Sequence, residues 1–223
     1  MKSIISGFLF FLFFLQAVSA QEYRIGSPDG HLQVLIANEG SLHFLVQKDG
    51  RIIIPLAEVA MISGKRIFPD EKDKVHKTVK QNINTIIHPA VAIKNSTIKD
   101  EYNELTLKYK DHFNVVFRAY NDAVAYHFET GYPDSITVMG ERCNISFPDG
   151  TNAWFAYNDR WMNGYEHIYQ KQSIDSLGKD ETVQLPLLLE LKEGDKVLIT
   201  ESNLQDYPGM YFTGNNGRTL QSV

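Results

Sequence analysis

The sequence predicts an all-β protein, folded as an antiparallel β-sandwich, and three observations favour this class. Hydrophobic and polar residues alternate over several short runs, as they do in strands that bury one face. Turn-forming residues recur about every 8–12 residues. No long run has the period of an amphipathic helix. The chain has 223 residues, which is enough for a hydrophobic core of its own.

The first half of the chain predicts a β-hairpin followed by a third strand. Hydrophobic residues occupy every second position over residues 32–36 and again over 42–46, on either side of the turn Asn38-Glu39-Gly40. Asp49-Gly50 makes the next turn, before a strand over residues 51–54. These segments therefore predict a meander of neighbouring strands.

Further along the chain the same alternation returns three times, over residues 105–109, 113–117 and 124–128. Between the two groups of strands, residues 69–80 are rich in charged side chains and predict a solvated loop or an edge strand. Thr213–Gly217 is rich in turn formers, so we expect a hairpin loop there rather than a phosphate-binding cradle.

The first 20 residues have the pattern of a secretory signal peptide. Lys2 precedes an apolar run from Ile4 to Leu15, and Val18-Ser19-Ala20 supplies the small residues of a cleavage site. The apolar run is shorter than the roughly 20 residues that a membrane span needs. We therefore expect cleavage after Ala20, export, and a mature domain over residues 21–223.

Composition and motifs argue against several classes of function. The formal net charge is −5, which does not favour nucleic-acid binding. Cys143 is the only cysteine, so no disulfide can form within the chain. The seven histidines are scattered without an H-E-x-x-H motif, and the sequence has neither a G-x-S-x-G elbow nor a phosphate-binding glycine loop. Zinc, serine-hydrolase and nucleotide chemistry therefore find no support.

Glu201 is the most informative single residue. It ends a predicted strand that begins at Lys196, and period-2 alternation puts its side chain on the same face as Val197 and Ile199. A carboxylate on an apolar face needs a cation, a metal ion or several hydrogen-bond donors. The alternative is that the strand ends at Thr200 and that Glu201 lies in solvent. Periodicity alone leaves both interpretations open.

A second candidate is the segment from Trp154 to Tyr169, in which aromatic residues surround amides, carboxylates and an arginine. This composition suits carbohydrate binding, because sugar faces stack on aromatic rings while planar polar groups bond the hydroxyls. Asp159 and Glu166 are the candidate substrate-binding residues. The alternative is that most of these rings pack under a long loop.

Four segments of the sequence occur together, in the same order, in one known family. They are Ser27-Pro28-Asp29-Gly30, the stretch from Val116 to Tyr126, Tyr165-Glu166 ahead of Leu185-Pro186-Leu187-Leu188, and Ile199-Thr200-Glu201 followed by Asp206-Tyr207-Pro208-Gly209-Met210-Tyr211. In these segments the chain resembles the N-terminal domain of glycoside hydrolase family 97. The resemblance extends over roughly Gln21 to Val223.

The resemblance implies a fold, a metal and a location. The family's N-terminal domain is a mutarotase-like β-supersandwich that precedes a (β/α)8 barrel, and a Glu from the sandwich reaches the active site as a calcium ligand. Glu201 matches that residue, so Ca²⁺ shared with the barrel is the expected cofactor. The family is bacterial, which makes the periplasm the expected destination.

The resemblance also implies an activity, hydrolysis of α-glycosides such as α-glucosides or α-galactosides. Glycoside hydrolysis needs two carboxylates facing one bond, and in that family they lie on barrel strands. Because the chain stops before such a barrel, we expect an incomplete N-terminal domain that is inactive alone and has the catalytic barrel as its partner.

Two functions outside this interpretation are also consistent with the sequence. A free-standing carbohydrate-binding β-sandwich would explain the aromatic segment without a barrel. A mutarotase-like epimerase would need a His and a Glu paired in a cleft, and nothing in the sequence marks such a pair.

Overall fold

The computed structural model describes residues 21–64, 66–158, 164–205 and 207–223. The predicted signal peptide lies outside these ranges and stays a prediction. Within them, regular structure consists of one 3-10 turn, η1 (Ile174–Ser176), and of β-strands. The strands are β1 (Glu22–Gly26), β2 (Leu32–Glu39), β3 (Ser41–Lys48), β4 (Arg51–Ser63), β5 (Arg66–Phe68), β6 (Val75–Ile87), β7 (Ile98–Tyr109), β8 (Phe113–Tyr120), β9 (Val124–Thr130), β10 (Val138–Ser146), β11 (Asn152–Tyr157), β12 (Gln170–Ser173), β13 (Thr182–Glu190), β14 (Lys196–Ile199), β15 (Tyr211–Thr213) and β16 (Thr219–Ser222).

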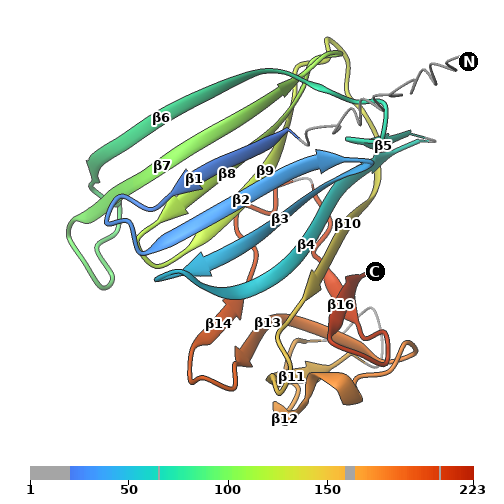
Figure 1. Ribbon diagram of the computed structural model, residues 1–223. Coiled ribbons are helices and arrows are strands. Elements are labelled where there is room, and N and C mark those ends of the chain that lie inside the picture. Colours follow the sequence, from blue (N-terminus) through green and yellow to red (C-terminus); the bar gives the residue numbers. More distant parts are fainter. Residues whose placement is uncertain (1–20, 65, 159–163, 206) are drawn as a thin grey trace, which may run out of the picture.

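The strands of the described residues form two antiparallel sheets. The larger sheet has the order β1-β2-β3-β4-β10-β16-β15-β13-β11-β12, with β5 on β4 and β14 on β13, and the smaller one has the order β6-β7-β8-β9. Figure 1 shows the smaller sheet lying against β1 to β4, while β11 to β16 form the lower end of the molecule. The predicted β-sandwich is therefore confirmed.

Aromatic side chains from both sheets meet in the core of the sandwich. Phe117 of β8 is fully buried and meets Phe44 of β3 edge to face, with 5.3 Å between ring centroids. Tyr126 of β9 lies 6.4 Å from the Phe117 ring. Pairs of this geometry contribute about 1 kcal/mol beyond the burial of their surface. These contacts join the two sheets face to face.

The strands follow the alternation in the sequence. Residues 32–36 and 42–46 lie in the paired strands β2 and β3, and the three later alternating runs lie in β7, β8 and β9. The turn at Asp49-Gly50 has positive φ at both residues, as a tight hairpin turn requires. Thr213–Gly217 joins the antiparallel strands β15 and β16. The charged segment 69–80 leads into β6, an edge strand of the smaller sheet.

Asp195 connects the β13–β14 turn to the β3–β4 turn of the same sheet. It lies in the turn between β13 and β14, and its carboxylate accepts hydrogen bonds from Lys48 at 3.0 Å and from Arg51. Both cations flank the turn between β3 and β4. The hydrogen bond and charge of Lys48, with the charge of Arg51, lower the pKa of Asp195.

We expect Asp195→Asn to lower the free energy of unfolding by about 1 kcal/mol at pH 7. Because the pKa of Asp195 is lowered in the folded state, the contribution is present above its unfolded pKa of about 3.9 and is lost as pH falls through the folded value. Urea unfolding at pH 7 and at pH 3 measures this, with Asp149→Asn, an exposed carboxylate 4.0 Å from Arg218, as control. A difference that persists undiminished in acid would contradict the ion-pair explanation.

Candidate functional site

Glu201 lies just beyond a strand that is shorter than the sequence predicts. β14 ends at Ile199, so neither Thr200 nor Glu201 belongs to it. The reason lies in the partner strand, where Ile199 pairs with Leu187 and the next residue along is Pro186. Proline has no N–H to continue the ladder. The alternation of burial nevertheless continues beyond the strand: Thr200 is exposed and Glu201 is half-buried.

The Glu201 carboxylate closes a loop. Its two oxygens lie 3.1 and 2.9 Å from the backbone nitrogen of Met210, which donates to them. Gly209 lies beside the same carboxylate, since a methyl group added there would be 3.8 Å from Oε2. Among the described residues, no lysine or arginine pairs with Glu201. Glu201 is therefore held by a backbone donor rather than left in solvent, and the described residues do not neutralise its charge.

A second carboxylate, Glu141 of β10, lies near the same loop. Its Oε1 accepts a hydrogen bond from the Tyr126 hydroxyl at 2.5 Å, and its Oε2 accepts one from the Tyr207 hydroxyl at 2.7 Å. Burial raises the pKa of Glu141, and the negative charge of Glu201 raises it further, while the two tyrosine donors act in the opposite direction. The Glu201 charge thus acts on Glu141, which joins the two carboxylates in one electrostatic environment at this loop.

Tyr165, from the segment Trp154 to Tyr169, contacts Tyr211 at the end of this loop. Its ring stacks on Tyr211 with 6.4 Å between centroids, and the two hydroxyl oxygens lie 2.7 Å apart. This hydrogen bond, followed by burial, raises the pKa of Tyr211 to about 12. Tyr165 is exposed and has a φ of 56°, an uncommon backbone conformation for an aromatic residue. Tyr211 directly follows Met210, so the stacked pair lies close to the Glu201 carboxylate.

The structure separates the other members of the aromatic segment into packed and exposed residues. Phe155 is buried and meets Tyr157 edge to face, so for these two the alternative of packed rings is correct. Glu166 is exposed and follows Tyr165 in the chain. Asp159 lies outside the described residues, so its predicted contact with substrate stays a prediction.

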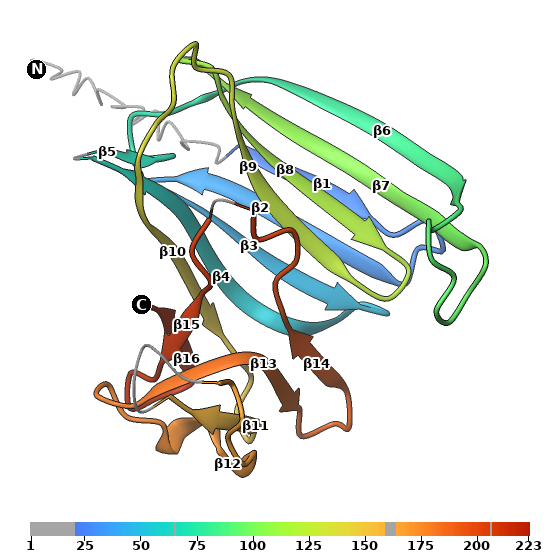
Figure 2. The same cartoon turned by 180° about the vertical axis from the view of Figure 1, so that it is seen from behind.

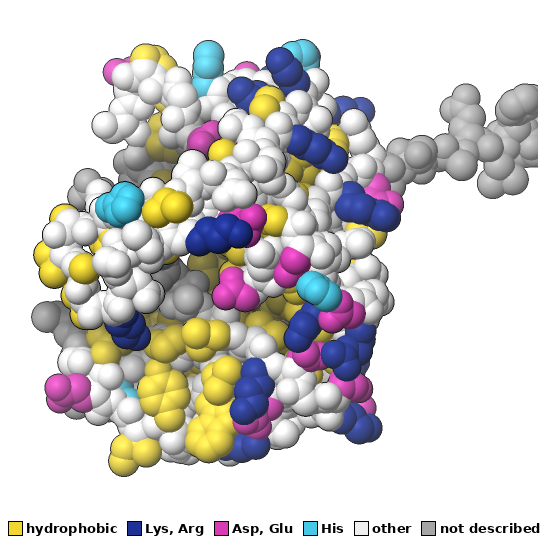
Figure 3. All heavy atoms as spheres, turned by 90° about the vertical axis from the view of Figure 1, so that its left-hand side faces the viewer, with side chains coloured by type: hydrophobic (Ala, Val, Ile, Leu, Met, Phe, Trp, Pro, Cys, Tyr) yellow, Lys and Arg dark blue, Asp and Glu magenta, His cyan; other side chains and the backbone are white. Residues whose placement is uncertain are grey.

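An apolar row crosses the lower end of the larger sheet. Leu188 of β13 pairs with Trp154 of β11 on one side and with Leu198 of β14 on the other. Trp154 and Leu198 are exposed, and the Lys171 ammonium lies 5.6 Å from the Trp154 ring centroid. Figure 3 shows hydrophobic side chains gathered at the lower part of the face that it presents. The row offers an apolar contact surface beside the aromatic segment.

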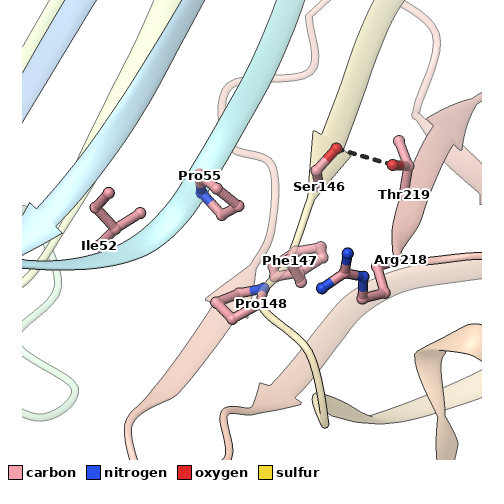
Figure 4. Close-up of a pocket in the computed structure, with 7 residues that line it drawn as sticks. All are labelled: Ile52, Pro55, Ser146, Phe147, Pro148, Arg218 and Thr219. Carbon is pink, nitrogen blue, oxygen red and sulfur yellow. Dashed lines mark hydrogen bonds between the residues drawn. The ribbon is translucent and has the colours of Figure 1, made fainter.

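A hollow of about 510 Å³ lies between β4, β10 and the start of β16 (Figure 4). Ser146 and Thr219 form a hydrogen bond of 2.8 Å at its rim. None of its lining residues is a carboxylate, so the hollow lacks the acid and base of glycoside hydrolysis. Its lining consists of Ile52, Pro55, Ser146, Phe147, Pro148, Arg218 and Thr219.

Acidic side chains at this loop are too few, among the described residues, to make a metal site. No group of three or more His, Cys, Asp or Glu side chains among them could hold a metal ion. Carboxylate oxygens are the ligands that calcium prefers, and it takes six to eight of them. The two oxygens of Glu201 share the single N–H of Met210, whereas each oxygen of Glu141 accepts a separate tyrosine hydroxyl. The donor chemistry therefore suits calcium, and Glu201 can supply one or two ligands. The described residues also contain no helix that is long and apolar enough for a membrane crossing.

Comparison with known proteins decides the family. The sequence model of the glycosyl-hydrolase 97 N-terminal domain matches residues 25–223. The chain belongs to this family. A retaining alpha-galactosidase of Bacteroides thetaiotaomicron is 30% identical over 212 residues, which cover 91% of the chain and 32% of the galactosidase. The chain therefore spans about a third of that relative.

Solved structures of family 97 enzymes share the fold of this domain. A family 97 enzyme of Pseudoalteromonas sp. strain K8 in complex with acarbose superposes with a TM-score of 0.79 at 20% identity, over 90% of this chain and 31% of the enzyme. The same enzyme has been solved in complex with panose. A beta-arabinopyranosidase superposes with a TM-score of 0.81 at 20% identity, over 91% of this chain and 35% of that one.

Of the two carboxylates at this loop of the family 97 domain, Glu201 is a candidate from the sequence and Glu141 is not. A signal was present, because Glu141 lies on the same face of β10 as Cys143 and Ile145, and those two residues are buried. Glu141, like Glu201, is therefore a carboxylate in register with apolar neighbours. Its tyrosine partners come from distant parts of the chain, and no local pattern indicates them.

Proposed function

We propose that this chain is the N-terminal sandwich of an exported α-glycoside hydrolase, in which Glu201 supplies a calcium ligand to an active site completed by a barrel domain. The half-buried Glu201 carboxylate, fixed by the Met210 amide, is the observation that carries this proposal. Family membership supports the wider role, since the matching curated relative is a retaining alpha-galactosidase three times as long as the matched region. The periplasm is the proposed location.

The residues of this chain would bind calcium and sugar and would take no part in bond cleavage. Calcium bound at the active site would polarise the reacting groups there. Glu201 would hold one side of the ion, because the Met210 amide fixes the direction of its carboxylate. Glu166 and Asp159 would contact the sugar beside the exposed Tyr165 ring. The catalytic acid and its partner would come from the barrel.

We expect the chain alone to bind calcium more weakly than a Kd of about 10⁻³ M, because one Glu offers at most two of the six to eight oxygens that calcium takes. Glu201→Gln should abolish this binding, since the amide brings no charge and one oxygen fewer. Titration calorimetry with calcium chloride measures it. Glu193→Gln, an exposed Glu in the turn after β13, is the matched control and should bind like the unaltered chain. Equal heats for Glu201→Gln and the unaltered chain would refute the ligand role.

A free-standing carbohydrate-binding domain is the second candidate, favoured by the exposed Tyr165 ring and the exposed Trp154. The two candidates differ in what this chain does without calcium. A binding module would bind an α-glucoside such as panose in the presence of a chelator, and Tyr165→Ala would remove that affinity. A sandwich that only completes a barrel would not bind the sugar measurably by itself.

A further inference from the structure

The described residues of the loop over 200–210 are mostly exposed to solvent. Between Glu201 and Met210, the described residues are exposed except for Tyr207, which is half-buried. Gln205 donates its N–H to the Asn203 carbonyl, a bond that stays within the loop. Figure 2 shows the chain after β14 rising beside β9 and β10 before it returns to β15. Tyr207 is therefore the described side chain through which the middle of the loop reaches the sandwich.

Glu141 joins three parts of the molecule at the place where Tyr207 arrives. Its carboxylate accepts the Tyr207 hydroxyl of the loop and the Tyr126 hydroxyl of β9 in the smaller sheet, while Glu141 itself belongs to β10 in the larger sheet. Hydrogen bonds of hydroxyl groups to a charged carboxylate are short and strong. The network thus fastens the loop to both sheets at once.

The backbone at Glu141 is also held. Its carbonyl accepts a hydrogen bond of 2.8 Å from the Ser222 hydroxyl, and the same hydroxyl accepts one of 2.8 Å from the N–H of Cys143. Ser222 belongs to β16, so the neighbouring strand braces β10 where Glu141 projects. A side chain on a braced strand makes a firmer anchor than one on a loop.

We propose that Glu141 is a positioning residue that, through Tyr207, holds the loop so that the Glu201 carboxylate keeps its place and direction. The consequence for calcium rests on the proposed function, whereas the anchoring itself does not. A carboxylate suits this role better than an amide, because both partners are hydroxyl donors and only a carboxylate accepts at both oxygens. Glutamine would present an NH2 group to one of the tyrosines.

The test measures the loop directly. In metal-free buffer, Tyr207→Phe and Glu141→Gln should each make the amide hydrogen of Met210 exchange about tenfold faster, because the loss of one such hydrogen bond favours the open loop by that factor. Exchange of the Phe44 amide in β3 should not change, which separates loop opening from global unfolding. Tyr23→Phe is the matched control, since the buried Tyr23 hydroxyl has no hydrogen-bond partner among the described residues.

Calcium titration of the same variants separates this proposal from the proposed function. Faster Met210 exchange together with weaker calcium binding in Tyr207→Phe supports both. Faster exchange in a chain that binds no calcium supports the anchor and contradicts calcium binding by the sandwich alone. Unchanged Met210 exchange in Tyr207→Phe overturns the anchor. Loss of calcium binding in Glu141→Gln without any change in exchange also overturns it, because Glu141 would then be a direct ligand.

Discussion

Gly214→Ala should destabilise the domain by about 3 kcal/mol or more, because the new methyl group has no room. A Cβ on Gly214 would lie 1.9 Å from the carbonyl oxygen of Leu177 and 2.5 Å from its carbonyl carbon. Backbone atoms cannot turn aside as a side chain can. The close approach is held by the hydrogen bond from the Gly214 N–H to the Gly178 carbonyl, at 3.1 Å, and by the Thr213 hydroxyl, which reaches the Lys179 carbonyl at 2.7 Å.

Urea unfolding of Gly214→Ala against the unaltered chain measures this effect. Gly140→Ala is the matched control, since its added methyl group would come no closer than 3.9 Å to a neighbouring atom, the Ile62 side chain, and we expect it to change stability by about 0.5 kcal/mol at most. Similar midpoints for the two variants would show that residues 177 and 214 do not approach as closely as described.

Phe117→Ala should lower the free energy of unfolding by about 3–5 kcal/mol. The ring is fully buried where the two sheets meet, so its loss leaves a cavity lined by Phe44 and Tyr126 and removes the edge-to-face contact. Phe117→Leu keeps most of the volume and should cost about 1–2 kcal/mol. Chemical unfolding of the two variants gives the comparison, and a loss below about 1 kcal/mol in Phe117→Ala would mean that the sheets do not depend on this contact.

The sandwich could be predicted from local sequence because its strands bury one face each. Residues 32–36 and 42–46 show this plainly, since alternate side chains in β2 and β3 are buried. The end of β14 could not be predicted in this way. Thr200 and Glu201 continue the alternation, and what stops the strand is Pro186 in a different strand.

At the candidate site, too, local sequence predicts some features, whereas contacts between distant residues cannot be predicted from it. The resemblance singles out Glu201, whereas its register with Val197 and Ile199 alone leaves two interpretations open. The stacking of Tyr165 on Tyr211 and the bonds from Tyr126 and Tyr207 to Glu141 join residues far apart in the chain. Such contacts follow from the packing of the sheets, which periodicity does not specify. The calcium role of Glu201 remains a proposal.

The position of Pro186 has a consequence for how this domain can vary among relatives. On one edge of β13, Leu187 pairs with Ile199 at the end of β14, and Gln184 pairs with Tyr211 at the start of β15. The two ends of the intervening loop therefore stand about 10 Å apart along a single strand. A loop with such close ends can lengthen at small entropic expense, about 0.6 kcal/mol per doubling, without shifting either strand. The length of this loop can thus diversify while the sheet beneath it stays the same.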